Sequence, residues 1–323
     1  MRMESEILCG SNRVRCDLSE SATITHSWNS SHQERYARRD SAKLKISIVI
    51  ISFNQARFLR ECLDSVLGQD HDDVEYIVVD PGSTDGSREI IEDYGCRITP
   101  LFEPDYGPAD GLNKGFAVAT GEVFGFLNSD DCLLPGALTC VARAFDSRPD
   151  VDVIAGCGYF IDADGRWLRR VIPSRFTPWL YAHRAVTIFQ QGTFFRRTSF
   201  ENVNGFNAEN RIAWDAELFL DMVLSGARFA RISDDLALFR LYSTSITGSG
   251  GHSNANEAYR AHRERVFFKA AGRNRAKSDW AVDRVARMVK HTSNPTYLVG
   301  RIIAASDWSR RKRREGKTMR DAQ

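Results

Sequence analysis

The stretch KLKISIVIISFN, residues 43–54, decides the fold of this chain. Isoleucine and valine follow one another almost without a break between positions 46 and 51. Such a run of β-branched residues is typical of a strand that is covered on both faces. The sequence therefore predicts that this strand lies in the centre of a sheet.

Strand and helix patterns alternate in the hundred or so residues that follow. An amphipathic helix is predicted over 55–69, where apolar residues recur at helical spacing and Gly68 suits the C-terminal cap. Further strands are predicted over 74–80, 97–103, 122–128 and 151–156, and further helices over 87–95, 108–120 and 135–145. This alternation is typical of a parallel sheet with helices on both faces.

The pattern changes after residue 157. We expect a hairpin around Asp164-Gly165 and then a mixed segment over 187–200. The later helices are predicted over 213–227, 256–290 and 295–314. The predicted fold class is α/β: a Rossmann-like, mostly parallel central sheet flanked by helices, with an α+β second half and a helical C-terminal extension.

The chain divides into four segments by composition. Residues 1–43 are polar and lack hydrophobic periodicity, so we expect a mostly disordered extension there. Residues 44–156 form the first half of the sheet domain and 157–250 its second half. Residues 251–323 form the helical extension, which ends in the basic run DWSRRKRREGK.

Bulk composition excludes several classes of protein. The hydrophobic content of 42% is enough for a core, and the net charge of +2 gives no overall attraction to nucleic acid or membrane. The seven cysteines form no C-x-x-C pair, which argues against a disulfide framework or a structural zinc site. No run of about eighteen apolar residues occurs. We therefore expect a cytoplasmic protein without a membrane span.

Polar residues gather where the predicted strands of the first half end. They lie in Ser52-Phe53-Asn54, DPGSTDGS (80–87), EPDYGPAD (103–110) and NSDD (128–131). Ligands of open parallel sheets bind at the carboxyl ends of the strands, so these four segments predict a binding site at one edge.

Each polar segment also has a purely structural interpretation. DPGSTDGS can be a turn with a helix N-cap, and DGLNKG can be a helix surface. Asp130-Asp131 can form a turn before Pro135. Two adjacent carboxylates at the end of a buried strand are nevertheless costly without a compensating cation or hydrogen-bond donors.

The set of segments resembles the family 2 glycosyltransferases of the GT-A fold, which move a sugar from a nucleotide diphosphate sugar to an acceptor. The resemblance covers roughly residues 44–245. It rests on four segments in the family's order: SIVIISFNQARFLRECLDSVLGQ, YIVVDPGSTDGSREII, EPDYGPADGLNKGFAVATGEVFGFLNSDD and WDAELFLDMVLSG.

The resemblance implies a nucleotide site at the first two strand ends. Ile51 and Phe53 would flank the base, and Asp80 would accept a hydrogen bond from it. Many family members carry a second acidic residue where this chain has Pro81, which weakens the case for uracil. A UDP-sugar is still the donor that we expect first.

The third and fourth strand ends would hold the rest of the donor. Asp110, Asn113 and Lys114 would bind the ribose or the diphosphate, although Lys114 can equally be a solvated helix lysine. By resemblance to the family's D-x-D-type motif, Asp131 would ligate Mg²⁺ or Mn²⁺. Asp130 would contact the ribose, the sugar or a metal-bound water. Both metals prefer oxygen ligands and need few protein carboxylates beside substrate phosphates.

Asp215 matches the position of the family's catalytic base. An acceptor hydroxyl needs a base as it attacks the anomeric carbon, and the first turn of a helix favours a carboxylate. Asp215 can also be a simple helix cap, and Trp214 either an acceptor-sugar platform or a core residue. Many relatives carry a His or a basic residue near FRLYSTSITGS, where Arg240 could offset the charge of the leaving group.

The implied activity is metal-dependent, inverting sugar transfer to a glycan or polyprenyl-linked acceptor in cell-surface polysaccharide or glycolipid biosynthesis. Two other interpretations stay open: nucleotidyl transfer, for which the Gly-rich loop is missing from SFNQARF, and a catalytically inactive GT-A-like nucleotide-binding or scaffold protein. The basic C-terminal run can be a solvated tail or a peripheral contact with the inner face of an anionic membrane. No nucleic-acid motif accompanies it.

Overall fold

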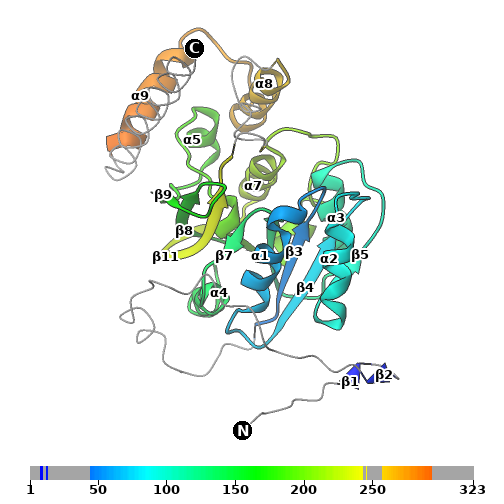
Figure 1. Cartoon of the computed structure of the whole chain (residues 1–323). Helices are drawn as coiled ribbons and strands as arrows, with labels where there is room; N and C mark the ends of the chain where they lie inside the picture. The colour runs from blue at the N-terminus through cyan, green and yellow to red at the C-terminus, as the bar shows by residue number, and fades with distance from the viewer. Residues whose placement is uncertain (1–7, 10–11, 14–43, 243–244, 246–256, 293–323) are drawn as a thin grey trace, which may run out of the picture.

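The computed structural model describes residues 8–9, 12–13, 44–242, 245 and 257–292. Within these residues, a nine-stranded sheet lies between helices (Figure 1). Its order is β5-β4-β3-β6-β10-β8-β11-β7, with β9 beside β8. The strands are β3 (Ile46–Ile51), β4 (Val74–Val79), β5 (Thr99–Leu101), β6 (Val123–Asn128), β7 (Cys132–Leu133), β8 (Val153–Ile161), β9 (Trp167–Val171), β10 (Thr193–Arg196) and β11 (Phe229–Arg240).

The helices follow the predicted alternation in the first half of the chain. Pro108 stands at the first position of α3, where its missing N–H costs no hydrogen bond. The helices are α1 (Ala56–Leu67), α2 (Ser87–Asp93), α3 (Pro108–Val118), α4 (Ala137–Asp146), α5 (Pro178–Ala182), α6 (Arg197–Glu201), α7 (Trp214–Leu224), α8 (Glu257–Ala271) and α9 (Asp279–Thr292), with short 3₁₀ turns η2 (Gly95–Arg97) and η3 (Gln190–Gly192).

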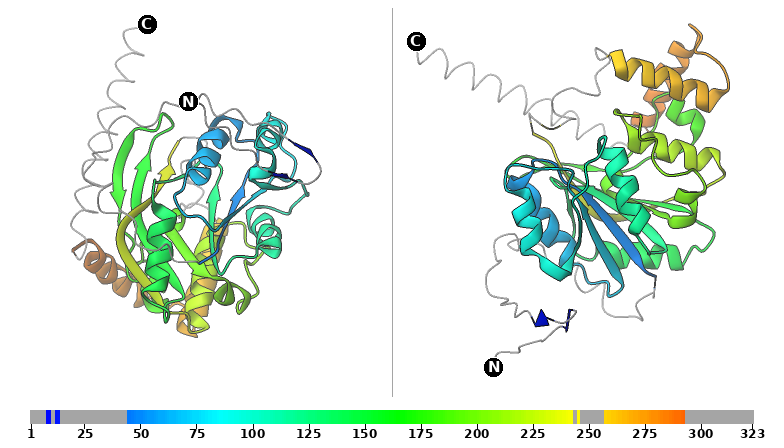
Figure 2. Two further views of the ribbon diagram at one scale, coloured as in Figure 1. Left: turned by 90° about the horizontal axis from the view of Figure 1, so that it is seen from below. Right: turned by 90° about the vertical axis from the view of Figure 1, so that its right-hand side faces the viewer.

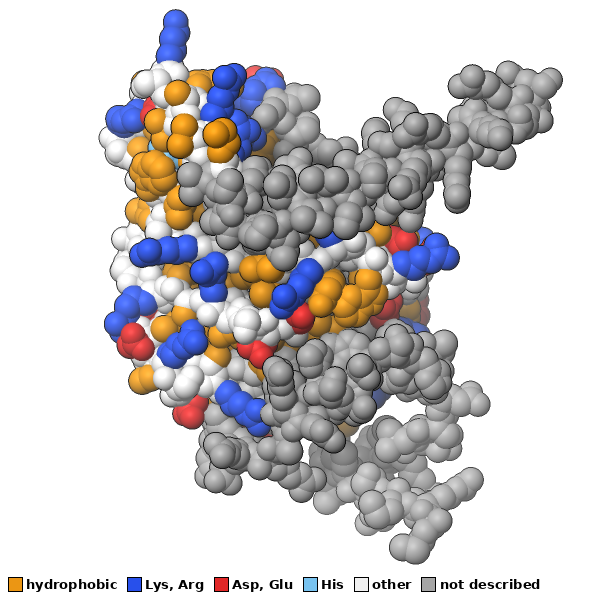
Figure 3. Space-filling view, turned by 90° about the vertical axis from the view of Figure 1, so that its left-hand side faces the viewer, with side chains coloured by type: hydrophobic (Ala, Val, Ile, Leu, Met, Phe, Trp, Pro, Cys, Tyr) orange, Lys and Arg blue, Asp and Glu red, His pale blue; other side chains and the backbone are white. Residues whose placement is uncertain are grey.

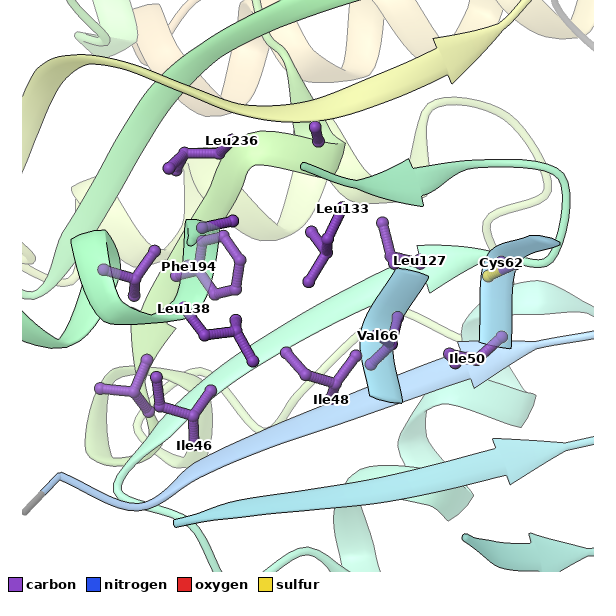
Figure 4. Packing of buried hydrophobic residues seen from close by; sticks show 14 of the residues in the cluster. Ile46, Ile48, Ile50, Cys62, Val66, Leu127, Leu133, Leu138, Phe194 and Leu236 are labelled. Carbon is purple, nitrogen blue, oxygen red and sulfur yellow. The ribbon is translucent and has the colours of Figure 1, made fainter. Parts of the chain in front are cut away.

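Strand β3 lies in the centre of the parallel half of the sheet, as predicted. It pairs in parallel with β4 on one side and with β6 on the other. Its residues alternate between the two faces: Ile46, Ile48 and Ile50 point to one apolar cluster, and Val49 to another. Figure 4 shows the three isoleucines facing Val66 and Leu138.

Helices cover both faces of the sheet. Side chains of α1, α2 and α4 pack with the even-numbered isoleucines of β3, whereas those of α3 and α7 pack with Val49. The second cluster is rich in phenylalanine, and Phe116 of α3 stacks on Phe124 of β6 with ring centroids 4.6 Å apart. The predicted α/β layering is therefore confirmed.

The second half of the sheet is mixed. Strand β10 is antiparallel to both β6 and β8, while β11 runs parallel to β8. The hairpin predicted around Asp164-Gly165 is present as β8 and β9. The sequence patterns did not predict β7, β10 or the long strand β11, because these strands follow one another without the regular helix spacing of the first half.

The C-terminal region departs from the prediction of one helix over 256–290. Two helices, α8 and α9, occupy it, and α8 ends before Gly272, which has a left-handed φ of 68°. Glycine adopts this conformation without strain, so it ends the helix. Figure 2 shows α8 and α9 gathered beyond one end of the sheet.

Other predictions fall largely outside the described residues. In the extension 1–43, only β1 (Leu8–Cys9) and β2 (Asn12–Arg13) are described, and they form a short antiparallel pair. The predicted helix 295–314 and the basic run lie beyond residue 292. No helix among the described residues combines the length and the hydropathy that crossing a bilayer requires.

Candidate functional site

The loops after β3 and β4 are joined by hydrogen bonds at the carboxyl edge of the sheet. The backbone N–H of Asn54 donates to Ser83 Oγ at 2.8 Å, and the N–H of Thr84 donates to Asn54 Oδ1 at 2.9 Å. The N–H of Ala56, at the start of α1, donates to Asp85 Oδ2 at 2.9 Å. The first two of the four polar segments that the sequence placed at this edge therefore do meet.

Asp80 is the centre of the loop after β4. Its carboxylate is fully buried and accepts hydrogen bonds from the N–H groups of Gly82 and Ser83 and from the Ser83 hydroxyl, at 3.0, 2.8 and 2.6 Å. Arg88 Nε lies 3.3 Å away. Burial raises the pKa of Asp80, but these donors outweigh it and hold the pKa below its ordinary value. The carboxylate fixes the loop, and its predicted contact with a base stays a prediction.

The end of β3 presents an aromatic ring to solvent. Phe53 is 60% exposed, whereas Ile51 is half-buried and its carbonyl accepts a hydrogen bond from the Ser129 N–H at 3.1 Å. An exposed phenylalanine at a strand end offers a face on which a nucleobase can stack. The bond from Ser129 places the loop after β6 beside that ring.

The start of α3 holds the next group of predicted site residues. Lys114 Nζ lies 3.1 Å from Asp110 Oδ2 and also donates to the Pro104 carbonyl. Asn113 donates to the Phe206 carbonyl at 2.8 Å and accepts from the Phe206 N–H at 2.9 Å. The Asn113 side chain therefore connects α3 to the segment before α7, and its contact with the donor stays a prediction.

Asp131 lies in the interior behind the carboxyl edge. Its side chain is fully buried, and Oδ1 accepts the backbone N–H of Arg240 at 2.9 Å. Its Oδ2 accepts from Gln191 Nε2 at 2.8 Å and from Asn128 Nδ2 at 3.2 Å. Burial and the neighbouring charge of Asp130 raise the pKa of Asp131 well above its ordinary value. Both carboxylate oxygens already hold donors from the protein.

Asp130 is the more open member of the pair. It is half-buried, and Oδ2 accepts a hydrogen bond from the Tyr242 hydroxyl at 2.9 Å. The same hydroxyl lies 3.3 Å from Gln55 Oε1, so it connects the loop after β6 to the start of α1. Burial raises the pKa of Asp130, although the bond from Tyr242 and the charge of Arg240 oppose the rise.

Arg240 supplies the positive charge that the adjacent aspartates demand. It is only 1% exposed, and its Nη2 donates to Glu61 Oε2 of α1 at 2.6 Å. Its Nε donates to the Asp130 carbonyl at 2.9 Å, and Nη1 reaches the carbonyls of Asp162 and Ala163 at 3.3 and 3.4 Å. A side chain with this burial and these partners supports the loop, and its contact with a leaving group stays a prediction.

The sequence analysis did not identify two residues of this region, Gln190 and Gln191. Gln191 holds Asp131, and its neighbour Gln190 donates to the Phe126 carbonyl at 2.7 Å. Both glutamines are buried. The two consecutive glutamines in the apolar segment TIFQQGTFF could have indicated a buried hydrogen-bonding site, because buried amides need partners.

Asp215 stands in the first turn of α7. The preceding Trp214 packs on Phe126 of β6 and on Phe206, with ring centroids 5.6 and 5.4 Å apart. Phe126 lies four positions before Asp130 on the same strand and its loop. Packing of the half-buried Trp214 therefore joins the start of α7 to β6. The roles of Asp215 as a base and of Trp214 as an acceptor platform stay predictions.

The side chains of this region can be compared with the ligands that a divalent cation requires. No group of three or more His, Cys, Asp or Glu side chains suited to a metal occurs in the part of the chain that the structure describes. A nucleotide-bound Mg²⁺ or Mn²⁺ needs only one or two protein carboxylates, because phosphates and waters complete its shell. Asp130 is the more open of the two carboxylates, whereas Asp131 accepts three hydrogen bonds within the protein. The role of Asp131 as the metal ligand stays a prediction.

Comparisons with known proteins agree with this geometry. Residues 47–204 match the model of the family described as Glycosyl transferase family 2. An uncharacterized glycosyltransferase of Nostoc sp. is 41% identical over 115 residues, which are 34% of this chain and 36% of the relative. The chain thus spans about a third of that relative's length.

Solved structures share the fold. TarS of S. aureus in complex with UDP-GlcNAc superimposes with a TM-score of 0.56 at 20% identity, over 77% of this chain and 73% of TarS. The mannosyltransferase PcManGT of Pyrobaculum calidifontis in complex with GDP-Man and Mn²⁺ gives 0.53 at 20% identity, over 81% and 75%. These likenesses confirm the GT-A fold. Residues 47–204, just under half of the chain, therefore match glycosyltransferase family 2, as the sequence analysis expects.

Proposed function

We propose that this chain is a metal-dependent, inverting glycosyltransferase that moves a sugar from a nucleotide diphosphate sugar to an acceptor hydroxyl. One observation carries the proposal. The carboxyl edge of a family 2 domain brings together an exposed aromatic ring, three interlinked loops and the paired aspartates Asp130 and Asp131.

The donor would lie across the ends of β3, β4 and β6. Phe53 offers its face to the base, with Ile51 beside it, and Asp80 shapes the loop that borders them. Asp110 and Lys114, in the first two turns of α3, are the proposed contacts to a ribose or a phosphate, together with Asn113. TarS binds UDP-GlcNAc and PcManGT binds GDP-Man, so a nucleotide sugar, with UDP first, is the proposed donor.

The proposed carboxylates for Mg²⁺ or Mn²⁺ are the pair Asp130 and Asp131: Asp131 is the ligand that the family resemblance implies, and Asp130 is the more open member beside it. When bound, the cation acts as a Lewis acid that offsets the charge of the departing diphosphate. PcManGT was solved with Mn²⁺, which supports this choice of cofactor. Tyr242 orients Asp130 through its hydroxyl, and Arg240 stabilises the turn that carries both aspartates.

Asp215 is the proposed base. It would take the proton of the acceptor hydroxyl while the acceptor oxygen forms a bond to the anomeric carbon. The bond between that carbon and the diphosphate oxygen breaks, and its electron pair leaves with the nucleoside diphosphate. A single displacement of this kind inverts the anomeric configuration. A positioned base of this type contributes about 10²- to 10⁴-fold in rate.

The proposed acceptor is a glycan or a polyprenyl-linked sugar of cell-surface polysaccharide or glycolipid biosynthesis, and the proposed location is the cytoplasm, in peripheral contact with the membrane. The alternative is a GT-A-like protein that binds a nucleotide, or serves as a scaffold, without catalysis. The intact Asp130 and Asp215 favour the enzyme.

Thermal unfolding with a panel of nucleotides tests the donor site. UDP, GDP, TDP, CMP and ADP are each added with and without MnCl₂ to the wild type, to Asp130→Asn and to the exposed control Asp146→Asn. We expect one nucleotide to raise Tm in the presence of Mn²⁺, since a ligand at 100 times its Kd stabilises by about 2.7 kcal/mol. Asp130→Asn should lose the Mn²⁺-dependent part, and the control should keep it. A wild type that responds to no nucleotide would favour the scaffold.

A further inference from the structure

A cavity of about 340 Å³ lies beside α7, between α5, α8 and α9. Four of its lining residues are cationic: Arg184 after α5, Arg263 of α8, and Arg287 and Lys290 of α9. No Asp or Glu is among the lining residues that the structure describes. We call this cavity the basic pocket. In Figure 3, blue Lys and Arg side chains gather with orange hydrophobic ones at the top of the molecule, where α5, α8 and α9 lie in Figure 1.

The acidic side chains around the basic pocket are matched by other cations. Asp283 of α9 accepts from His183 Nδ1 and from Arg275, both at 2.9 Å. Glu217 of α7 lies 3.2 Å from Arg265 Nη2 and 3.6 Å from Lys269 Nζ. These two carboxylates are engaged by cations that do not line the cavity. Asp215 lies near Tyr181 of the lining, and the described lining itself holds four cations and no Asp or Glu.

Two cations of the basic pocket, Arg184 and Arg263, lie close enough for their charges to repel each other. Burial lowers the pKa of Arg263, and the nearby charge of Arg184 lowers it further. Like charges that share a partly desolvated space repel each other, and an anion among them removes the repulsion. Arginine also presents several donors in a planar fork that matches phosphate oxygens. The lining therefore has the chemistry of a phosphate site.

The basic pocket borders the proposed base. Ala213, two residues before Asp215, lines the cavity and holds a left-handed φ of 53°. Tyr181 lines it as well, and the nearby charge of Asp215 adds to the rise in pKa that burial gives the Tyr181 phenol. A molecule anchored in this cavity would therefore extend past Asp215.

The cavity is distinct from the donor site at the carboxyl edge. None of the described lining residues belongs to the loops after β3, β4 or β6. Its volume lies near the lower end of the usual range for small-molecule pockets, roughly 300 to 1,000 Å³. That space accommodates a phosphate group together with the unit that it esterifies.

We propose that the basic pocket binds a phosphate ester or diphosphate group of the acceptor, next to the hydroxyl that Asp215 deprotonates. This inference rests on the proposed function and narrows the acceptor to molecules that carry such a group. Prenyl phosphates and polyol phosphates share this chemistry.

Calorimetric titration with defined probes tests the pocket. Inorganic phosphate, glycerol 3-phosphate and geranyl phosphate are titrated at constant ionic strength, with geraniol as the uncharged control, in the absence and presence of UDP and MnCl₂. The proteins are the wild type, the double variant Arg287→Gln/Lys290→Gln, the single variant Arg287→Gln, and Arg284→Gln. Arg284 is an exposed cation of α9 that does not line the cavity, so it controls for the loss of charge.

We expect the wild type to bind at least one phosphate compound also when UDP and Mn²⁺ are present. The double variant should bind it at least about tenfold more weakly, because hydrogen bonds to charged groups are lost. Arg287→Gln should show part of that loss, and Arg284→Gln should bind as the wild type does. A preference for geranyl phosphate over glycerol 3-phosphate would assign the site to a prenyl-linked acceptor, and the reverse to a polyol phosphate.

The outcomes separate the two proposals. Equal binding by the double variant and the wild type, or a wild type that binds nucleotide but no phosphate probe, would overturn the acceptor class and leave the donor site standing. A wild type that binds phosphate in the basic pocket but no nucleotide would overturn the proposed function and leave an anion site.

Discussion

The carboxylate region, which comprises Asp130, Asp131 and Arg240 with their partners, differs from the basic pocket in how charge is held. In the first, the two carboxylates and the guanidinium contact backbone, amide and hydroxyl groups and the Glu61 carboxylate. In the second, four cations surround a cavity of about 340 Å³. The carboxylate region supports a loop of the protein, and the basic pocket is a cavity with an excess of positive charge.

The difference shows that burial alone does not mark a binding residue. Arg240 and Asp131 are deeply buried charged groups near the edge of the sheet, and their partners lie within the protein. Asp130 and Phe53 are more exposed and remain able to meet a ligand. Preorganised geometry of this kind is what a catalytic site requires of its supporting residues.

Of the substitutions considered, that of Arg240 should lower the free energy of unfolding the most. Arg240→Met removes the donors for Glu61, for the Asp130 carbonyl and for the carbonyls of residues 162 and 163. Removing one partner of a buried ion pair costs about 3–5 kcal/mol, and because the Glu61 side chain is 30% exposed we expect about 3 kcal/mol. Urea unfolding measures the loss.

The matched control for this prediction is the exposed Arg166, which lies in the β8–β9 hairpin beside residues 162 and 163. Arg166→Met should change the free energy of unfolding by less than about 0.5 kcal/mol, as is usual for surface positions. Phosphate binding in the basic pocket should survive Arg240→Met under conditions where the variant is folded. An Arg240 variant as stable as the wild type would contradict the supporting role.

Substitution of Asp215 should affect turnover without affecting either binding region. Asp215→Asn keeps the size of the side chain and removes the base, so we expect a loss in kcat of at least ~10²-fold, equivalent to about 2.7 kcal/mol. Nucleotide binding and phosphate binding should both be retained. Steady-state kinetics with a donor found in the nucleotide panel measures the effect, with the exposed Glu209→Gln as the control. Unchanged turnover would remove Asp215 from the mechanism.

Substitution of Asp80 should have a smaller effect on the free energy of unfolding, and this effect should depend on pH. Its folded-state pKa is lowered, so its stabilisation is complete above the unfolded value of about 3.9 and is lost as the pH falls through the lower folded value. We expect Asp80→Asn to cost about 2 kcal/mol at pH 7, because hydrogen bonds to a charged acceptor are replaced. The gap to the wild type should remain at pH 5 and shrink near pH 3, as measured by urea unfolding.

The exposed Asp146→Asn should show no such pH dependence. A gap between Asp80→Asn and the wild type that stays constant from pH 7 to pH 3 would mean that the charge of Asp80 does not stabilise the loop. The loop would then depend on the neutral hydrogen bonds among Asn54, Ser83 and Thr84.

The first half of the molecule was predictable because its signals are local. The β-branched run of β3 and the helical spacing of α1 lie within short windows, and the parallel arrangement follows from their alternation. The polar segments were predicted to meet because the carboxyl ends of parallel strands share an edge. Only their sequence positions were needed for that inference.

The roles of individual residues depended on contacts far apart in the chain. Asp131 and Asp130 look alike in sequence, but Gln191 and Arg240, 60 and 109 positions away, occupy the oxygens of Asp131. Asn113 was predicted to bind the donor, whereas its amide joins Phe206, 93 positions away. The single helix expected over 256–290 is divided at Gly272, where the chain takes a left-handed turn.

Local patterns in the sequence were enough to predict the parallel first half of the sheet and the edge at which its polar residues gather, and four motifs in order pointed to the family. The folded chain was needed to see which aspartate is more open, that Arg240 supports the turn, and that cations from three separate segments line one cavity. These outcomes depend on long-range packing and on which polar groups it leaves to be paired, and no local pattern encodes them.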